Sequence, residues 1–167
     1  MYDELTKSDI EKMEKEIEYR KLVLRKELIG AVKEARAQGD LSENFEYYAA
    51  KREKNQNESR IRYLERMIKT AHIISDDSKE DEVGINNRVT IFLPEDDEEE
   101  TYRIITTIRG NSLQGLISID SPLGKALMGH KVGEEVMVKV NEDYSYPVVI
   151  RAIDKSINDT EDTIRKF

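Results

Sequence analysis

The sequence predicts an α+β protein of two domains, a long antiparallel helical hairpin followed by a small domain of strands with one short helix. Three observations support this fold class. Residues 8–38 and 43–74 contain no proline and a single glycine, Gly30. Beyond residue 87 the period of the apolar residues changes from 3.6 to 2, which is typical of strands. A polar, acidic segment separates the two regions and is expected to be a linker.

The first helix is expected over residues 8–38. Its apolar side chains recur at spacings of three, four or seven, which makes a narrow stripe typical of a coiled-coil seam. Thr6 or Ser8 can cap its start. The stripe consists of Ile10, Met13, Ile17, Leu24, Leu28, Val32 and Ala35.

The second helix is expected over residues 43–74. A short turn joins it to the first helix, so the two must run antiparallel. Each would span on the order of 45 Å at about 1.5 Å per residue. Residues 1–75 are thus predicted to form a coiled-coil hairpin with an acidic tip. The second stripe consists of Phe45, Tyr48, Ile61, Leu64, Ile68 and Ala71.

The middle of the second helix, residues 51–60, contains no apolar residue. One interpretation is that side-chain stems and amides pack in the seam, and interleaved acids and bases favour it. The residues proposed for this packing are Arg52, Asn55, Gln56 and Ser59. The alternative is a basic strip that contacts RNA. It would comprise Arg20, Lys21, Arg25, Lys26, Lys51 and Arg52.

The C-terminal part is expected to consist of a linker over 76–87, a domain over 88–154 and a flexible tail over 155–167. Ser121 is placed to cap a short helix that has Pro122 at its first position and ends at Gly129. The acids of residues 94–100 fall between two strands and are interpreted as a solvated hairpin loop rather than a cation site. Strands are expected over 88–93, 101–108, 115–119, 134–140 and 146–153.

Charge divides the chain unevenly. The net charge is −8. Residues 1–74 hold 16 Lys+Arg and 15 Asp+Glu, and residues 75–167 hold 11 and 20, which gives +1 and −9. The acidic half is a poor candidate for binding free nucleic acid. There is no cysteine, no signal peptide is visible and no apolar run is long enough to cross a membrane, so a cytoplasmic protein is expected.

The usual constellations of an enzyme are missing from the sequence. His72 and His130 are isolated, which excludes a histidine cluster for zinc. There is no thiol nucleophile, no G-x-S-x-G and no glycine-rich phosphate loop. A self-contained active site is therefore not expected.

Two carboxylates stand at the turn of the hairpin, where Asp40 and Glu43 follow Gly39. A purely structural interpretation is a capping box, with Asp40 as N-cap and Glu43 at the third helical position. Ser42 can cap instead, which would leave both carboxylates free. Spacing by itself favours the capping box.

The whole tip segment, "EARAQGDLSENFEYYAA", resembles the tip of the Gre transcript-cleavage factors of bacterial RNA polymerase. The matching positions are Glu34, Ala35, Arg36, Gly39, Asp40, Glu43, Asn44, Glu46, Tyr47 and Ala50. A second block, "LISIDSPLGKALMGHKVGEEVMVKV", resembles the C-terminal domain of that family, which implies an FKBP-like fold. Phe45 and Tyr48 depart from the family pattern and are expected to stack against the first helix, on Val32, Ala35 or Arg36.

The resemblance implies an accessory factor whose hairpin enters the secondary channel of the polymerase. There Asp40 and Glu43 would help to hold a Mg²⁺ of the polymerase, which then cleaves backtracked nascent RNA. Support for the tip is expected from Arg36, Gly39, Ser42, Asn44, Glu46 and Tyr47, and docking on the channel rim from Asp120, Ser121 and Pro122. No cofactor is expected on the isolated chain.

Two rival functions remain open at this point. A non-cleaving channel binder would regulate the polymerase from the same position, although the presence of both acids argues against it. A peptidyl-prolyl isomerase in the C-terminal half would need an aromatic pocket, for which few aromatic residues are available. The sequence leaves the GreA or GreB subtype undecided.

Overall fold

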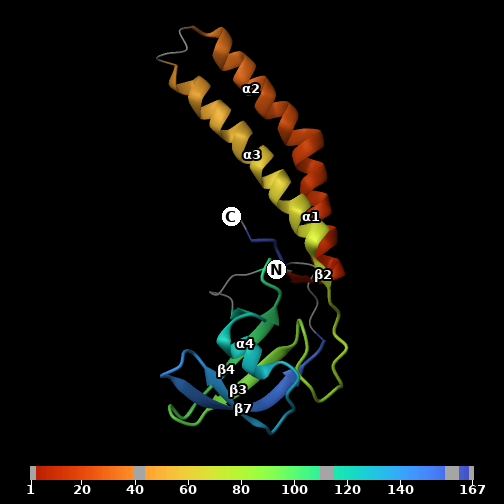
Figure 1. Cartoon of the computed structure of the whole chain (residues 1–167), viewed down its shortest axis with the longest axis vertical. Coiled ribbons are helices and arrows are strands. Elements are labelled where there is room, and N and C mark those ends of the chain that lie inside the picture. Colours follow the sequence, from red (N-terminus) through yellow and green to blue (C-terminus); the bar gives the residue numbers. More distant parts are fainter. Residues whose placement is uncertain (1–2, 40–43, 110–114, 157–161, 166–167) are drawn as a thin grey trace. The chain divides into compact units, whose positions relative to one another are not determined.

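The computed structural model describes residues 3–39, 44–109, 115–156 and 162–165. The chain forms two compact units (Figure 1). One unit is the helical hairpin, Ile10–Ala71, and the other contains Asp3–Asp9 together with the chain from His72 onward. The second unit is called the C-terminal domain below. The predicted α+β fold class with a helical hairpin is confirmed.

The first arm of the hairpin is helical from Lys7 to Ala37 but not uniformly α-helical. Helix α1 (Lys7–Tyr19) passes into a π-helical turn, η1 (Arg20–Leu24), and then into α2 (Arg25–Ala37). Thr6 and Asp9 form a reciprocal capping box at its start. The Thr6 hydroxyl accepts the Asp9 amide at 3.2 Å, and the Asp9 carboxylate accepts the Thr6 amide at 2.9 Å.

The second arm is a single helix, α3 (Phe45–Thr70). It ends four residues earlier than predicted because Ala71 is extended and the next two residues form strand β2 (His72–Ile73). This strand pairs in parallel with β1 (Glu4–Leu5), a short ladder that the sequence analysis missed. Two residues per strand are too few to show a period.

The seam of α3 differs from the predicted stripe. Seven of its buried and half-buried residues follow a strict alternation of three and four, as in the seam of a coiled coil. They are Tyr47, Ala50, Lys54, Asn57, Ile61, Leu64 and Ile68. Phe45 and Tyr48 are 86% and 48% exposed, so their predicted place in the seam is wrong. Tyr47 lies in the seam instead. Alternating steps of four and three residues back from Ile61 lead to Tyr47 and not to Phe45 or Tyr48.

A polar layer fills the seam where the apolar residues run out. Asn57 and Arg60 are buried, and Asn57 donates to the Arg20 carbonyl at 3.2 Å and accepts from the Arg20 guanidinium at 2.9 Å. Glu16 accepts from Arg60 at 2.8 Å and from Arg20 at 2.7 Å. Of the four side chains predicted to pack here, Arg52, Asn55 and Gln56 are exposed, so their predicted place is wrong, and Ser59 is half-buried.

The π-turn lies directly opposite this layer. A π-turn inserts an extra residue into a helix, and Asn57 bonds the carbonyl of its first residue, Arg20. Ion pairs continue the contact between the arms on either side. Lys21 pairs with Glu65 at 2.5 Å, and Arg25 binds Glu58 through two bonds of 2.8 and 2.9 Å.

The C-terminal domain is built on a five-stranded sheet with the order β5-β4-β3-β7-β6. All neighbours are antiparallel except β4 and β5, which are parallel. The bounds are β3 (Arg88–Leu93), β4 (Glu98–Ile105), β5 (Leu116–Ser118), β6 (Glu135–Lys139) and β7 (Ser145–Asp154). Five strands are present as predicted, and a tight turn over residues 94–97 joins β3 to β4. The hairpin loop was expected over 94–100 and the second strand over 101–108, but β4 begins at Glu98 and ends at Ile105, so residues 98–100 belong to the strand.

Helix α4 (Pro122–Leu127) lies against the sheet, and its Leu127 is fully buried in the core (Figure 1). Val83 and Ile85 belong to the same core, although residues 76–87 were expected to be a linker. Two apolar side chains within a polar segment are too few to reveal a packed element. The segment expected to be a flexible tail also makes defined contacts, at Lys155 and over Asp162–Arg165.

Candidate functional site

The tip of the hairpin is framed by two ordered helix ends. Helix α2 closes at Gln38, and Gly39 follows with φ of +142°, a conformation that favours glycine. Asp40, Leu41, Ser42 and Glu43 lie outside the described residues, and they include the two predicted catalytic acids and Ser42. The description of the tip resumes at Asn44.

Asn44 is the N-cap of α3 and also joins the two arms. Its side-chain oxygen accepts the Tyr47 amide at 3.0 Å, which satisfies one of the free donors at the helix start. Its side-chain amide donates to the Ala35 carbonyl at 2.6 Å, in the last turn of α2. The capping-box interpretation, with Asp40 as the N-cap, is therefore wrong, and so is the alternative with Ser42 as the cap. The helix begins later than that interpretation required.

Tyr47 and Arg36 support the tip from the seam. Tyr47 is 8% exposed, and its hydroxyl accepts a hydrogen bond of 3.3 Å from the Arg36 guanidinium, which lies 5.5 Å from the ring centroid. The Arg36 hydrogen bond lowers the pKa of the Tyr47 hydroxyl. Glu46 is exposed in the first turn of α3 and lines a small groove with Glu34 of α2. The predicted support residues Arg36, Asn44 and Tyr47 are thus brought together.

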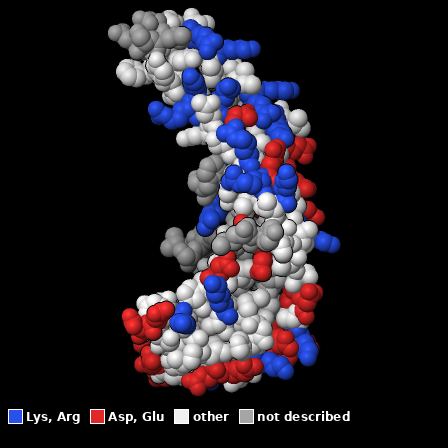
Figure 2. All heavy atoms as spheres, in the orientation of Figure 1, with Lys and Arg blue, Asp and Glu red and all other residues white. Residues whose placement is uncertain are grey.

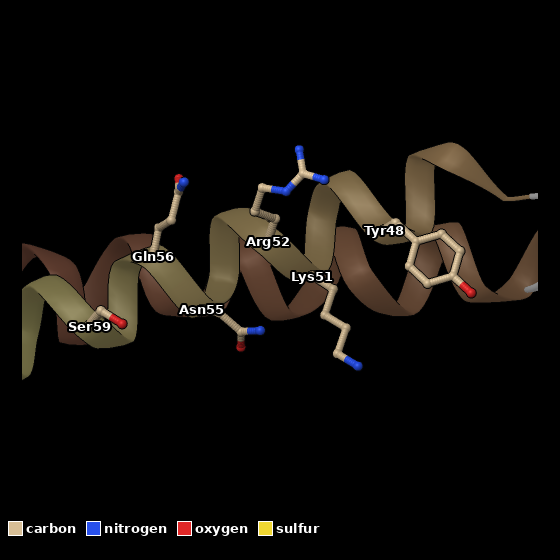
Figure 3. A pocket seen from close by; sticks show the side chains of 6 residues that line it. All are labelled: Tyr48, Lys51, Arg52, Asn55, Gln56 and Ser59. Carbon is tan, nitrogen blue, oxygen red and sulfur yellow. The ribbon is translucent and has the colours of Figure 1, made fainter.

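The predicted basic strip separates into two groups. Arg20, Lys21 and Arg25 are engaged with acids of the hairpin. Lys51 and Arg52 instead project from the outer face of α3, where they line a groove (Figure 3). The remaining lining residues are Tyr48, Asn55, Gln56 and Ser59. Asn55 and Gln56 were predicted to pack in the seam, and only the correct phase of α3 identifies them as surface residues, whereas Ser59 is half-buried.

Charge along the first arm of the hairpin is graded. Residues 7–19 hold three Lys+Arg and five Asp+Glu, whereas residues 20–37 hold six and two. Figure 2 shows Lys and Arg gathered over the part of the hairpin that carries the tip, on the face in view. Such a surface favours an approach to phosphates.

The predicted docking loop precedes α4 in the C-terminal domain. Ser121 caps this helix by accepting the Gly124 amide at 3.1 Å, and its hydroxyl donates to the Ser118 carbonyl at 2.6 Å. Pro122 occupies the first turn, and Asp120 is exposed beside it. A side chain at Gly124 would meet the Ser118 carbonyl at 2.1 Å, so the close approach requires glycine. These bonds and the glycine therefore fix the backbone conformation of the loop.

Within the described ranges, no group of three or more His, Cys, Asp or Glu side chains is arranged to hold a metal ion. No helix in these ranges is long and apolar enough to span a membrane.

Two family models cover the chain in the same order as its two units. The model described as "Transcription elongation factor, N-terminal" matches residues 4–73, and that described as "Transcription elongation factor, GreA/GreB, C-term" matches residues 77–155. The chain belongs to the GreA/GreB family of transcription elongation factors. Its tip segment and its C-terminal block both lie within these matches.

Two relatives that share much of its sequence agree with this assignment. The transcription elongation factor GreA of Geobacillus kaustophilus is 48% identical over 136 residues, which cover 81% of this chain and 86% of the relative. GreA of Bacillus subtilis is 44% identical over 135 residues with the same coverage. The solved structure of GreA factor homolog 1 from Thermus thermophilus is 27% identical, covers 92% of this chain and 99% of its own, and has a TM-score of 0.42.

Membership of the GreA/GreB family assigns the function at the level of class. The protein is a transcription elongation factor that acts on RNA polymerase.

Proposed function

We propose that this GreA/GreB-family factor inserts its hairpin into the secondary channel of RNA polymerase and stimulates Mg²⁺-dependent cleavage of backtracked nascent RNA by the polymerase. Asp40 and Glu43 are the residues that act there. The rescued complex can then resume elongation. The protein works where the polymerase works, in the cytoplasm.

The observation that carries this proposal is the cap of α3. Asn44 caps the helix and closes the contact to α2, so neither acid is needed as the N-cap. This supports a role for Asp40 and Glu43 other than helix capping. Carboxylates also fit the group that the proposal requires, because Mg²⁺ prefers hard oxygen ligands and often takes only one or two carboxylates from a protein.

The chain's own contribution is to present these carboxylates at a fixed end of the hairpin. Helix α3 has 26 residues and is about 39 Å long at 1.5 Å per residue, which suits a probe that reaches deep into a large enzyme. The bonds of Asn44 and the Arg36–Tyr47 contact hold the two helix ends together at the tip. A bound Mg²⁺ would supply activation of water and stabilisation of the leaving oxygen.

The basic surface and the C-terminal domain have supporting roles in this proposal. Lys51 and Arg52 are exposed, and no acid is among the described residues that line their groove, so these two members of the predicted strip are placed to meet RNA phosphates. The loop at Asp120–Pro122 would dock on the rim of the channel. Docking raises the local concentration of the tip without changing its chemistry.

The test is an assay of stalled, backtracked elongation complexes with and without the full-length protein. The expected result is faster release of short 3′ RNA fragments, followed by resumed synthesis when nucleotides are added. Slower elongation without any new RNA fragments would instead identify a non-cleaving channel regulator.

A further inference from the structure

The C-terminal segment inserts a carboxylate between two buried arginines. Asp162 accepts from Arg103 through both of its oxygens, at 2.8 Å each, and from Arg109 at 2.9 Å. Backbone contacts hold the same segment in place. Ile164 forms an isolated β-bridge with Arg109, and the Arg165 amide donates to the Ile108 carbonyl at 2.7 Å. This segment lies beyond residue 155, where the family model ends.

The two arginines are built into the C-terminal domain. The Arg103 side chain is 7% exposed and that of Arg109 is 1% exposed. Arg109 also pairs with the fully buried Asp9 at 2.6 Å, and Thr106 donates to Asp9 at 2.7 Å. Because Asp9 belongs to the capping box of α1, the first turn of that helix is part of the same network.

Asp162 is the carboxylate that Arg103 and Arg109 share. Removal of Asp162 would take this acceptor from both arginines, and breaking a buried ion pair by removing one partner is strongly unfavourable. Burial raises the pKa of Asp162, but the hydrogen bonds and charges of Arg103 and Arg109 outweigh it and lower the pKa overall. A forked guanidinium with a second arginine beside it is the geometry that recognises carboxylates.

We propose that Arg103 and Arg109 form a carboxylate-binding site that the chain fills with its own C-terminal segment. Asp162 of the same chain is the bound ligand. A small carboxylate can take its place. The site lies in the C-terminal domain, so the inference does not depend on the proposed chemistry of the tip.

Chemical rescue of full-length Asp162→Ala tests the site. The variant is expected to melt on the order of 10 °C below wild type, because a buried ion pair loses one partner. Sodium formate, which supplies the missing carboxylate, should raise its melting temperature clearly more than sodium chloride at equal ionic strength. Wild type should respond equally to both salts.

Two controls separate the site from general effects. Thr163→Ala changes an exposed neighbour in the same segment and should melt as wild type does. Adding Arg103→Gln to Asp162→Ala should abolish the formate effect, because the forked donor is gone.

The proposal is overturned if formate acts no better than chloride on Asp162→Ala, or if that variant is as stable as Thr163→Ala. Should Asp162→Ala be unfolded in chloride at 25 °C, recovery of its circular dichroism spectrum in formate is the expected result. Failure to recover in formate overturns the proposal equally.

Discussion

At the scale of single residues, Asn44 is the side chain that changes the interpretation of the tip. An asparagine offers an acceptor and a donor on one short side chain, and Asn44 uses the first for the Tyr47 amide and the second for the Ala35 carbonyl. A carboxylate could supply only the acceptor. The residue therefore does structural work that the acids before it in the chain were first expected to do.

Asp40 should thus be dispensable for stability but not for activity. Asp40→Asn and Asp40→Ala should unfold at nearly the same denaturant concentration as wild type, because a cap is not lost. Both should reduce stimulation of RNA cleavage by an order of magnitude or more, since an amide or methyl group is a poor partner for Mg²⁺. Cleavage rates are measured against Mg²⁺ at saturating factor.

Higher Mg²⁺ should restore part of the activity of Asp40→Asn by mass action. Coincident Mg²⁺ curves for wild type and Asp40→Asn would show that the carboxylate is not used in the reaction. A stability loss of about 0.5–2 kcal/mol in Asp40→Ala would instead indicate a capping role.

At the scale of secondary-structure elements, the hairpin is held by apolar side chains at its ends and by a polar layer in between. Asn57 and Arg60 are buried and bond Arg20 and Glu16 of the other arm. A buried polar residue in a coiled coil costs stability but specifies register. Here it pairs with a π-turn, so the register of the two arms depends on a few directional bonds.

Asn57→Ala should destabilise the hairpin by about 1–3 kcal/mol, because the carbonyl and the guanidinium of Arg20 each lose the hydrogen bond to Asn57. Asn55→Ala is the matched control, since Asn55 lies two residues away on the exposed face and its loss should change stability by less than about 0.5 kcal/mol. Urea unfolding followed by circular dichroism at 222 nm measures both. Equal effects of the two substitutions would contradict the assigned phase of α3.

Glu16 should make the stability of the hairpin depend on pH. Burial raises its pKa, but bonds and charges of Arg60 and Arg20 outweigh this, so the pKa is lowered from its ordinary value of 4.5. A lowered pKa means that the contribution is complete above about pH 4.5 and is lost as the pH falls below it.

Substitution of Glu16 by Gln tests this dependence. The difference in unfolding free energy between wild type and Glu16→Gln should be largest near pH 7 and should shrink below pH 4.5. Glu18→Gln, an exposed site on the same helix, provides the control and should show no such trend. A constant difference between wild type and Glu16→Gln from pH 7 to pH 3 would contradict the ion pairing.

At the scale of the whole molecule, the proposed function divides chemistry and attachment between the two units. Tip residues belong to one compact unit and the Asp120–Pro122 loop to the other. In the proposed function the C-terminal domain tethers the tip, and tethering alters the concentration that is needed rather than the maximal rate.

Asp120→Lys should therefore raise the factor concentration for half-maximal cleavage about fivefold, which corresponds to about 1 kcal/mol of binding free energy. The maximal cleavage rate should not change. Asp143→Lys makes the same charge change on an exposed site of a different loop, and should leave both quantities unaltered. A lower maximal rate for Asp120→Lys, with unchanged half-maximal concentration, would contradict a docking role.

The sequence by itself determined the class of the fold, the two arms of the hairpin, five strands and the short helix capped by Ser121. These follow from local rules, because periodicity, caps and turn residues act over a few neighbours. The resemblance of the tip segment likewise needed only residues that are adjacent in the chain.

Only the tertiary structure decided which polar residues are buried and which acids serve a structural purpose. These contacts join residues more than 30 positions apart: Asn57 with Arg20, Arg25 with Glu58, and Asp162 with Arg103. Such contacts depend on the phase of one helix against another and on the path of a terminal segment. No local pattern encodes them, because the same polar residue can be exposed to water or buried with a hydrogen-bond partner, and that partner lies far away in the sequence.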